Sequence, residues 1–358
     1  MRKAETSSHC LSISFEIWSR TSPAAIETMI GRVFDQLGEV IASVSNSSIT
    51  LSGTGVGKKS RVVRRDAAKA ENCSGVILAI VKTYGICWEQ NLVKWWFTYL
   101  VSISKDIKFG LDTFGDMTND LQGNPQSAGV VLRNVVEQAE LADSLGIDAF
   151  NVGEHHRDDY AVSSPDTVLA GIATKTEKIT LGTAVTVLSS DDPVRVYESF
   201  ATIDALSNGR AEITAGRGSF TESFPLFGYN LSDYHQLFEE KLELLVELLK
   251  EGPVTWQGQT RAALNNQQVY PKTEGGHMSL RVGVGGSPES VIRAARLQIP
   301  MALAIIGGDP ARFAPYANLY REALEKFGKP TDLPVSIHSP GFIAHTDAEA
   351  SNLMFPYY

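Results

Sequence analysis

Residues 147–165, IDAFNVGEHHRDDYAVSSP, join a short apolar run to a dense group of titratable side chains. The apolar run predicts a buried strand, and Glu154 and His155 follow it directly. Loops at strand ends carry the chemistry of α/β proteins because a rigid scaffold positions them. A histidine can exchange protons near neutral pH, and an adjacent carboxylate can orient its ring. Glu154 and His155 are therefore the candidate catalytic residues, whereas His156 supports the loop; polar loop residues without chemistry are the alternative.

Arg217 and Gly218 follow another predicted strand, in the sequence AGRGSF. A guanidinium can form two charged hydrogen bonds to a phosphate, and the flanking glycines leave backbone N–H groups accessible. A surface arginine in a turn is the alternative interpretation. We interpret Arg217 and Gly218 as part of a phosphate site.

Gly285, Gly286 and Ser287 precede a predicted helix, and Gly307 and Gly308 follow the next predicted strand. Free N–H groups and the dipole at a helix N-terminus favour a bound anion. Either glycine pair alone is also typical of an ordinary turn. Together they are consistent with the phosphate-binding part of a barrel.

From residue 107 the sequence alternates between predicted strands and predicted helices. An apolar stripe at helical spacing ends at Gly146, a residue typical of helix C-termini, and Asp192 can cap the helix that begins at Pro193. The predicted strands are 107–112, 147–152, 179–185, 211–215, 280–284, 301–306 and 335–343. The predicted helices are 126–145, 165–174, 193–206, 234–250, 288–297 and 310–327, with a hairpin or excursion at 254–276.

Repeated strand–helix units imply a parallel sheet with right-handed crossovers. Both a doubly wound sheet and a (β/α)8 barrel have this alternation. The first strand–helix connection, LDTFGDMTNDLQGNP, lacks the GxGxxG of a dinucleotide fold. The predicted fold is therefore an α/β barrel of the TIM type.

The first 105 residues differ in composition from the rest. They carry 13 Lys+Arg and 8 Asp+Glu, a net of +5, whereas residues 106–358 carry 19 and 33, a net of −14. We predict an N-terminal extension at 1–105 and a barrel at 106–358. The overall charge of −9 argues against nucleic acid as the main partner, because phosphate backbones are bound through Lys and Arg.

The three cysteines have neither an even count nor a CxxC spacing, so no disulfide framework and no metal site are predicted. This cysteine usage suits a reducing cytoplasm. The most apolar region, 76–103, is interrupted by charged and amide residues, so it lacks the uninterrupted run of about 20 apolar residues that a membrane span needs. We expect a cytoplasmic protein without a membrane segment.

Four blocks in this order resemble the bacterial luciferase-like flavin monooxygenases. They are VGEHH at 152–156, LGTAVTVLSSDDPVRVYE at 181–198, the run from DALSNGR to PLFGY at 204–229, and VGGSPESVIRAA with LAIIGG between 284 and 308. The resemblance runs from about residue 108 to the C-terminus and implies a (β/α)8 barrel that holds reduced FMN in its mouth. There the flavin reacts with O2 to oxidise a small organic substrate. NAD(P)H supplies the electrons, directly or through a separate flavin reductase, and homodimers are usual.

The same resemblance implies roles for individual residues. Glu154 and His155 match the family's Glu-His pair, in which the carboxylate can orient the histidine ring or bind flavin. Ala184 and Val185 match a step at which the family often has a non-prolyl cis peptide, with room for a flat ring to approach the backbone. From the residues alone, 182–185 is better interpreted as an ordinary buried strand. The second arginine that luciferase brings to the phosphate has no evident equivalent here, because Tyr234 stands near that position. We therefore expect phosphate affinity to depend more heavily on residues 285–287.

Two departures from the family pattern lead to a structural hypothesis. The extension at 1–105 has no counterpart, and the family's eighth βα unit is missing after residue 358. Strands 107–112 and 335–343 are therefore expected to have unpaired edges, as in an imperfect gene product with an unrelated upstream segment. A non-catalytic or defective flavin-binding relative and an F420-dependent oxidoreductase are the alternative functions.

Overall fold

The computed structural model describes residues 11–17, 107–120, 122–307, 310–341 and 346–354. Within the predicted extension it describes only a short strand, so the boundary at residue 105 stays a prediction. Of the predicted site residues, Gly308 lies outside the described residues.

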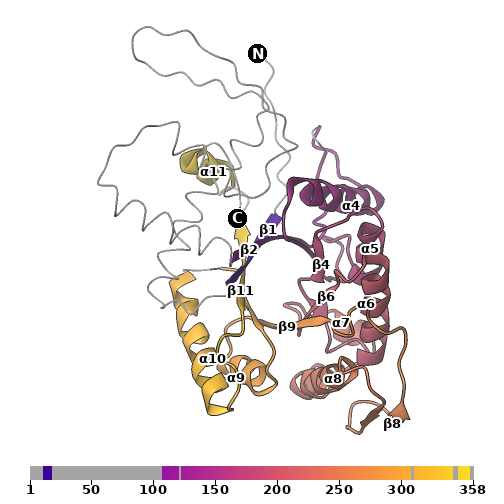
Figure 1. The fold of residues 1–358 in the computed structure, drawn as a ribbon. Coiled ribbons are helices and arrows are strands. Elements are labelled where there is room, and N and C mark those ends of the chain that lie inside the picture. The colour runs from indigo at the N-terminus through magenta and orange to yellow at the C-terminus, as the bar shows by residue number, and fades with distance from the viewer. Residues whose placement is uncertain (1–10, 18–106, 121, 308–309, 342–345, 355–358) are drawn as a thin grey trace, which may run out of the picture.

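A ring of strands forms the centre of the molecule, and helices surround it (Figure 1). The order of neighbouring strands in the sheet is β4-β3-β2-β1-β11-β10-β9-β6-β5. The strands are β1 Leu11–Ile17, β2 Ile107–Thr113, β3 Ala149–Val152, β4 Thr180–Thr183, β5 Thr186–Val187, β6 Glu212–Gly216, β9 Ser279–Val284, β10 Met301–Ala304 and β11 Val335–Gly341. Except for β1, neighbouring strands pair in parallel, as the alternating sequence predicts.

The sheet closes on itself between β4 and β6. Leu181 forms a parallel bridge with Ala211 and donates its backbone N–H to the carbonyl of Arg210 at 2.9 Å. A doubly wound sheet, the other architecture that the alternation allowed, does not close in this way. The predicted strand at 179–185 contains β4, and β5 follows just beyond it; the peptide bond between Ala184 and Val185, which separates them, is cis.

Strand β1 comes from the N-terminal region and lies antiparallel between β2 and β11. Ser14 is paired with Gly110 on one side and with His338 on the other. The expectation that the strands at 107–112 and 335–343 have unpaired edges was therefore wrong. Whether the chain lacks an eighth βα unit stays a prediction.

The main helices follow the predicted ranges. They are α4 Ala128–Leu145, α5 Pro165–Ala173, α6 Pro193–Ser207, α8 Tyr234–Leu248, α9 Pro288–Arg296 and α10 Ala314–Lys326. Gly146 ends α4 in the left-handed conformation, with φ of 80°, and the Asp192 carboxylate accepts a hydrogen bond from the Val194 N–H at the start of α6. Figure 1 shows α4, α5, α6 and α8 on one side of the ring and α9 and α10 on the other.

Several short elements were not predicted. They are α7 Ser223–Leu226, the 3-10 turn η2 Leu231–Asp233, and α11 Asp347–Met354, which follows β11. The helix predicted at 310–327 begins with a 3-10 turn, η3 Pro310–Phe313, and continues as α10. The expected hairpin at 254–276 is present as the antiparallel pair β7 Val254–Trp256 and β8 Leu264–Gln267.

Strand residues alternate between the interior of the ring and the helices outside it. Outward residues such as Phe150, Leu181 and Ile213 are fully buried and form the hydrophobic core with the helices. Inward residues, such as Asp112 and His338, line the interior instead. The period of two therefore separates an apolar face, which stabilises the fold, from a polar face available for chemistry.

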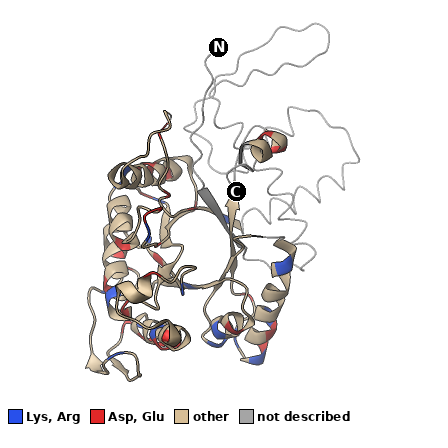
Figure 2. Cartoon of the chain, turned by 180° about the vertical axis from the view of Figure 1, so that it is seen from behind, with Lys and Arg blue, Asp and Glu red and all other residues tan. Residues whose placement is uncertain are grey.

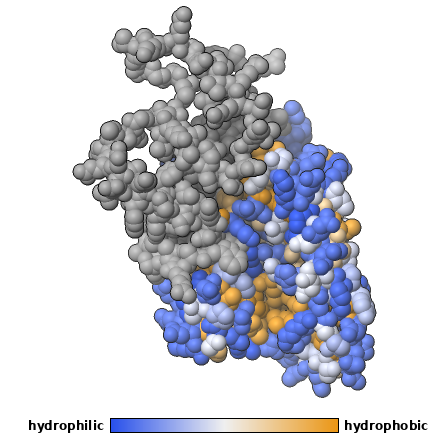
Figure 3. Space-filling model, viewed as in Figure 1, coloured by the Kyte–Doolittle hydropathy of each residue, from blue (hydrophilic) through white to orange (hydrophobic). Residues whose placement is uncertain are grey.

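The outer surface has mixed properties. Basic and acidic positions are interspersed along the helices (Figure 2). Hydrophobic residues gather in a hollow on the face that shows α8 and α9 (Figure 3). Within the described ranges, no helix has the length and apolar character needed to cross a bilayer.

Candidate active site

A cavity of about 540 Å³ lies inside the ring of strands, a size typical of small-molecule sites. Nine of the eleven predicted site residues line it: Glu154, His155, Ala184, Val185, Arg217, Gly218, Gly285, Gly286 and Ser287. Gly307 is exposed and lies just beyond β10. The residue before it, Ile306, lines the cavity. The structure thus places residues from four separate sequence blocks around one space.

The cis peptide forms part of the cavity wall. Val185 packs against two glycines on neighbouring strands, where an added Cβ atom would lie 2.4 Å from the Val185 side chain at Gly216 and 3.1 Å from it at Gly283. Any larger residue at Gly216 would displace Val185. This part of the wall therefore depends on glycine for the close approach of the backbone to Val185.

Glu154 connects the loop after β3 to the strand that follows the cis peptide. One carboxylate oxygen accepts a hydrogen bond from the Val187 backbone N–H at 2.9 Å, and the other accepts from the His156 ring at 3.0 Å. Of the two roles expected for Glu154, orienting the His155 ring is not what the structure shows, and binding flavin stays a prediction. Because His155 and His156 point to different surroundings, the carboxylate reaches only the second ring.

His155 lies among aromatic rings at the edge of the cavity. Its ring centroid is 4.4 Å from that of Tyr160, 4.9 Å from Phe220 and 5.0 Å from Phe114. Burial lowers the pKa of His155, although the neighbouring carboxylates of Glu222 and Glu154 oppose this effect. Near neutral pH the His155 ring is therefore uncharged and can accept a proton.

His156 has the opposite electrostatic environment. The hydrogen bond to Glu154 raises the pKa of His156, and burial only partly opposes it. Both side chains of this pair are 9% exposed, so solvent screens their interaction little. His156 also contacts Phe227, with ring centroids 5.1 Å apart. Its position supports the predicted role of His156 in holding the loop.

Arg217 lies at one end of the cavity, near the N-terminus of α9. Its guanidinium donates to the Ser290 hydroxyl at 3.3 Å, contacts the His235 ring nitrogen at 3.3 Å and lies 4.8 Å from the centre of the Tyr234 ring. Tyr234, which stands near the position of the expected second arginine, therefore packs against Arg217. Arg217 has further N–H groups with which to bind an anion.

The N-terminus of α9 faces the same end of the cavity. Ser287 is the N-cap, and its hydroxyl accepts a hydrogen bond from the Ser290 N–H at 3.3 Å. The Ser287 hydroxyl also donates to the Glu289 carboxylate at 2.9 Å. This helix start lies beside Gly285, Gly286 and Arg217. The positive charge of Arg217 and of the helix N–H groups there exceeds the negative charge of the Glu289 carboxylate.

These residues fit a phosphate-bearing flavin. The cavity is large enough for a planar ring beside the cis peptide, and its Arg217 end offers an arginine and a helix N-terminus for a phosphate. Within the described residues, no group of three His, Cys, Asp or Glu side chains could hold a metal ion.

The interior also contains polar residues that the sequence analysis did not select. The Asp112 carboxylate accepts hydrogen bonds from the His338 ring and from the Asn151 amide. Arg281 forms an ion pair with Glu212 at 2.8 Å and donates to Ser336 at 2.6 Å. A signal for them existed, since polar residues alternate with apolar ones along the strands that carry them.

Comparisons with known proteins agree with this architecture. The N-acetyl-S-alkylcysteine monooxygenase of Bacillus subtilis (strain 168) is 30% identical over 243 residues, which cover 65% of this chain and 68% of that protein. The uncharacterized protein y4vJ of Sinorhizobium fredii (strain NBRC 101917 / NGR234) is 36% identical over 138 residues, or 38% of this chain. The chain spans only 39% of the length of y4vJ.

A solved structure shares the fold. The oxygenating constituent of 3,6-diketocamphane monooxygenase from the CAM plasmid of Pseudomonas putida, in complex with FMN, superimposes with a TM-score of 0.56 at 19% identity. The match covers 69% of this chain and 70% of that one. The sequence model of the luciferase-like monooxygenases matches residues 113–358, which is more than half of the chain. The protein therefore belongs to the luciferase-like monooxygenase family.

Proposed function

We propose that the protein is an FMN-dependent monooxygenase that uses reduced flavin and O2 to oxidise a small organic substrate. The observation that carries this proposal is one cavity whose wall includes the Ala184–Val185 cis peptide and whose one end is cationic at Arg217. The phosphate of FMN would lie at the cationic end and its ring against the cis peptide. The chain's membership of a monooxygenase family and the FMN bound to the related camphane enzyme support the same cofactor.

In this proposal each part of the site has a separate task. Arg217 and the N-terminus of α9 bind the phosphate, and the wall at Val185 positions the ring. Reduced FMN supplies the electrons for oxygen activation. His155, which is uncharged near neutral pH, accepts a proton at the edge of the cavity and returns it to a product. Glu154 fixes the backbone of β5 through Val187 and thereby the wall against which the ring rests.

Comparing FMN with riboflavin tests the phosphate assignment, because the two molecules differ only in the phosphate. We expect Arg217→Gln to weaken FMN binding by about 10- to 100-fold, the value of one charged hydrogen-bond pair, and to change riboflavin binding less than about threefold. Flavin fluorescence quenching measures both affinities. Arg195→Gln, on the exposed face of α6, is the matched control and should change neither. Equal losses for FMN and riboflavin would contradict the assignment.

Two other functions remain as alternatives. An F420-dependent oxidoreductase would bind F420 more tightly than FMN in a direct competition. A non-catalytic relative would bind FMN but would leave NAD(P)H-dependent O2 uptake at the level that FMN gives without the protein, both with and without a general flavin reductase. A change from that level that occurs only with the reductase present would identify the electron source. A cytoplasmic location and a homodimer remain predictions, and light scattering of the purified protein tests the dimer.

A further inference from the structure

A second histidine–carboxylate pair lies inside the cavity, apart from the residues assigned to flavin binding. His338 on β11 donates its Nδ1–H to the Asp112 carboxylate on β2. Asp112 is 1% exposed, and its other carboxylate oxygen accepts from the Asn151 amide at 2.5 Å. A buried carboxylate held at both oxygens has a fixed direction, so it fixes the orientation of the imidazole as well.

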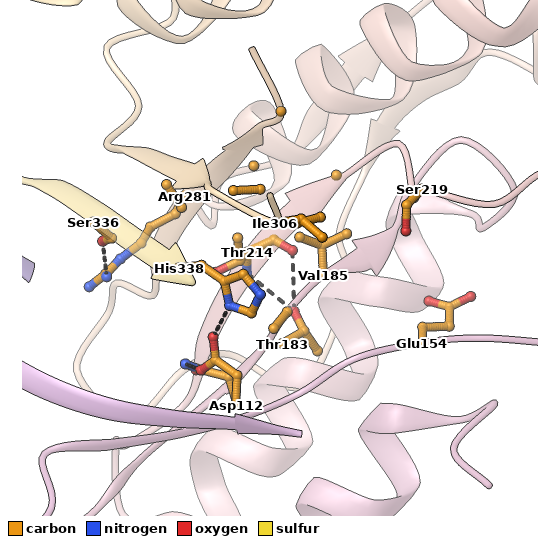
Figure 4. A pocket seen from close by; sticks show the side chains of 18 of the residues that line it. Asp112, Glu154, Thr183, Val185, Thr214, Ser219, Arg281, Ile306, Ser336 and His338 are labelled. Atoms are coloured by element: carbon orange, nitrogen blue, oxygen red, sulfur yellow. Dashed lines mark hydrogen bonds and ion pairs between the residues drawn. The ribbon is translucent and has the colours of Figure 1, made fainter. Parts of the chain in front are cut away.

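The pairing determines which ring nitrogen carries the proton. A carboxylate only accepts, so Nδ1 donates and Nε2 is left with a lone pair. Within the part of the chain that the structure describes, no residue gives His338 Nε2 a hydrogen bond. Figure 4 shows the ring extending into the cavity from Asp112 toward Thr183 and Val185. The free nitrogen therefore faces the space in which a ligand would lie.

We propose that His338, oriented by Asp112, accepts a proton from an acidic N–H or O–H group of the ligand in the centre of the cavity. This inference rests on the proposed flavin function for its role in catalysis, but the geometry of the pair does not. A base held by a carboxylate on its far nitrogen is the arrangement by which proteins activate an imidazole. Two ligands could supply the proton: the flavin ring or a hydroxyl group of the organic substrate.

The proton transfer needs no co-reactant. His338 Nε2 takes the proton, the ligand keeps the bonding electron pair and becomes an anion, and the imidazolium is neutralised by Asp112. The proton returns to the product or to solvent when the cycle closes. Electron-rich anions react more readily with an electrophilic oxygen donor than their neutral acids do. The pair would therefore serve a monooxygenase that acts on a phenol or an enol.

Six other charged or histidine side chains line the cavity. They are Lys108 on β2, Glu154 and His155 after β3, Glu212 on β6, Arg217 after β6 and Arg281 on β9. Glu212 pairs with Arg281, and Glu154 binds His156 and the Val187 N–H. Asp112 is the one carboxylate hydrogen-bonded to His338 within the described residues, so it determines which nitrogen of the neutral ring carries the hydrogen.

The first test needs no flavin. In protein labelled with 15N-histidine, the ring signals absent from His338→Asn identify His338, and their 15N shifts show which nitrogen is protonated. We expect a proton on Nδ1 in the native protein, and an altered tautomer balance in Asp112→Asn. A proton on Nε2 in the native protein would overturn the proposal, as would an unchanged ring in Asp112→Asn. His277→Asn, at an exposed histidine, is the control and should leave the His338 signals unchanged.

The second test identifies the proton donor. FMN affinity and the reduction potential of bound FMN are measured for native protein, His338→Asn and His277→Asn. In parallel, 4-nitrophenol is added at pH 6, and its absorbance reports the fraction bound as phenolate. A change in FMN affinity or potential in His338→Asn alone assigns the donor to the flavin. Unchanged FMN properties, with a phenolate fraction at least threefold higher in native protein than in His338→Asn, assign it to a substrate hydroxyl.

If neither FMN nor 4-nitrophenol distinguishes His338→Asn from native protein, the proposal is wrong. Failure of the proposed function has a different signature. Native protein would then not bind FMN at micromolar concentration, while the 15N and 4-nitrophenol results would still report on His338.

Discussion

The Glu154 carboxylate accepts a hydrogen bond from the Val187 backbone N–H at 2.9 Å, although the two residues belong to different strand–helix units. Glu154 follows β3, and Val187 ends β5 just beyond the cis peptide. Through this bond Glu154, which belongs to the stretch 147–165 with its many titratable side chains, holds the backbone of β5 in position. It also leaves His155, not Glu154, as the residue of that stretch best suited to proton transfer.

Glu154→Ala should lower the free energy of unfolding by about 1.5–3 kcal/mol, because it removes the acceptor of a charged hydrogen bond and leaves the Val187 N–H unpaired. Urea denaturation followed by circular dichroism measures the change. The control is Glu198→Ala, which removes an exposed ion pair with Arg195 and should cost less than about 1 kcal/mol. Equal losses in the two variants would show that the Val187 bond contributes little.

His156→Gln should destabilise the protein more at pH 5.5 than at pH 8.5. The hydrogen bond to Glu154 raises the pKa of His156 above 6.5, so the folded state holds the proton more tightly than the unfolded state. That stabilisation is fully present below the unfolded value and is lost as pH rises through the folded value. Unfolding free energies of native and variant protein across this range measure it.

His155→Gln is the internal comparison, because burial lowers the pKa of His155 below 6.5. The native protein loses stability relative to this variant as pH falls from the unfolded value toward the folded one. The two histidines should therefore give pH dependences of opposite sign. The same sign for both would contradict the assignment of their environments.

Gly216→Ala should lower stability by about 1–3 kcal/mol, as is usual when a packed site receives an extra methyl group. The new Cβ atom would lie 2.4 Å from the Val185 side chain and would displace the wall at the cis peptide. If FMN binds at this wall, its affinity should also fall. Thermal unfolding and fluorescence quenching measure the two effects.

Gly171→Ala is the matched control, since Gly171 lies within α5 and an added Cβ would have no atom within 4 Å. Replacing a helical glycine with alanine should raise stability by about 0.5–1 kcal/mol and leave flavin binding unchanged. A loss of stability in Gly171→Ala similar to that in Gly216→Ala would point to a cause other than Val185.

Ser14→Pro should destabilise the barrel, because Ser14 is paired with strands on both sides and proline cannot donate to either ladder. Loss of one backbone hydrogen bond of the sheet, with its acceptor left unpaired, costs about 1–3 kcal/mol. Ser14→Thr keeps the N–H group and should change stability by less than about 0.5 kcal/mol. Thermal melts that are the same for both variants would contradict the position of β1 in the ring.

The regular elements were predictable because their signals are local. The stripe that ends at Gly146 and the cap at Asp192 gave α4 and the start of α6 within two residues of the observed bounds. The gathering of Arg217 and residues 285–287 was also predictable, since parallel strands bring their C-terminal ends together. The features that could not be predicted are the direction in which a side chain points and the residue to which it hydrogen-bonds, because the spacing of residues in the sequence determines neither.

Three residues show where the sequence was insufficient. Glu154 binds His156 instead of His155 because the loop backbone, which has no periodic pattern, decides where each side chain points. Asp112 meets His338 although 226 positions separate them, and neither residue lies in a recognisable motif. Only an explicit division of each strand into inward and outward residues would have indicated both as cavity residues.

The N-terminal strand also has an alternating sequence, LSISFEI, which is typical of a β-strand. Its partners could not be predicted from that pattern. Repeated strand–helix units suggest parallel neighbours only, so they do not indicate that β1 would lie antiparallel between β2 and β11.

The position of β1 has a consequence for how the chain folds. Leu11 is paired with Gly341, a separation of 330 residues in sequence, since 341 − 11 = 330. Contacts of such high sequence separation form late, because the intervening chain must first lose its conformational freedom. During synthesis β1 emerges long before β11 and has neither neighbour in place. Until both arrive, its unpaired backbone groups are available to chaperones or to the edge strands of other unfinished chains.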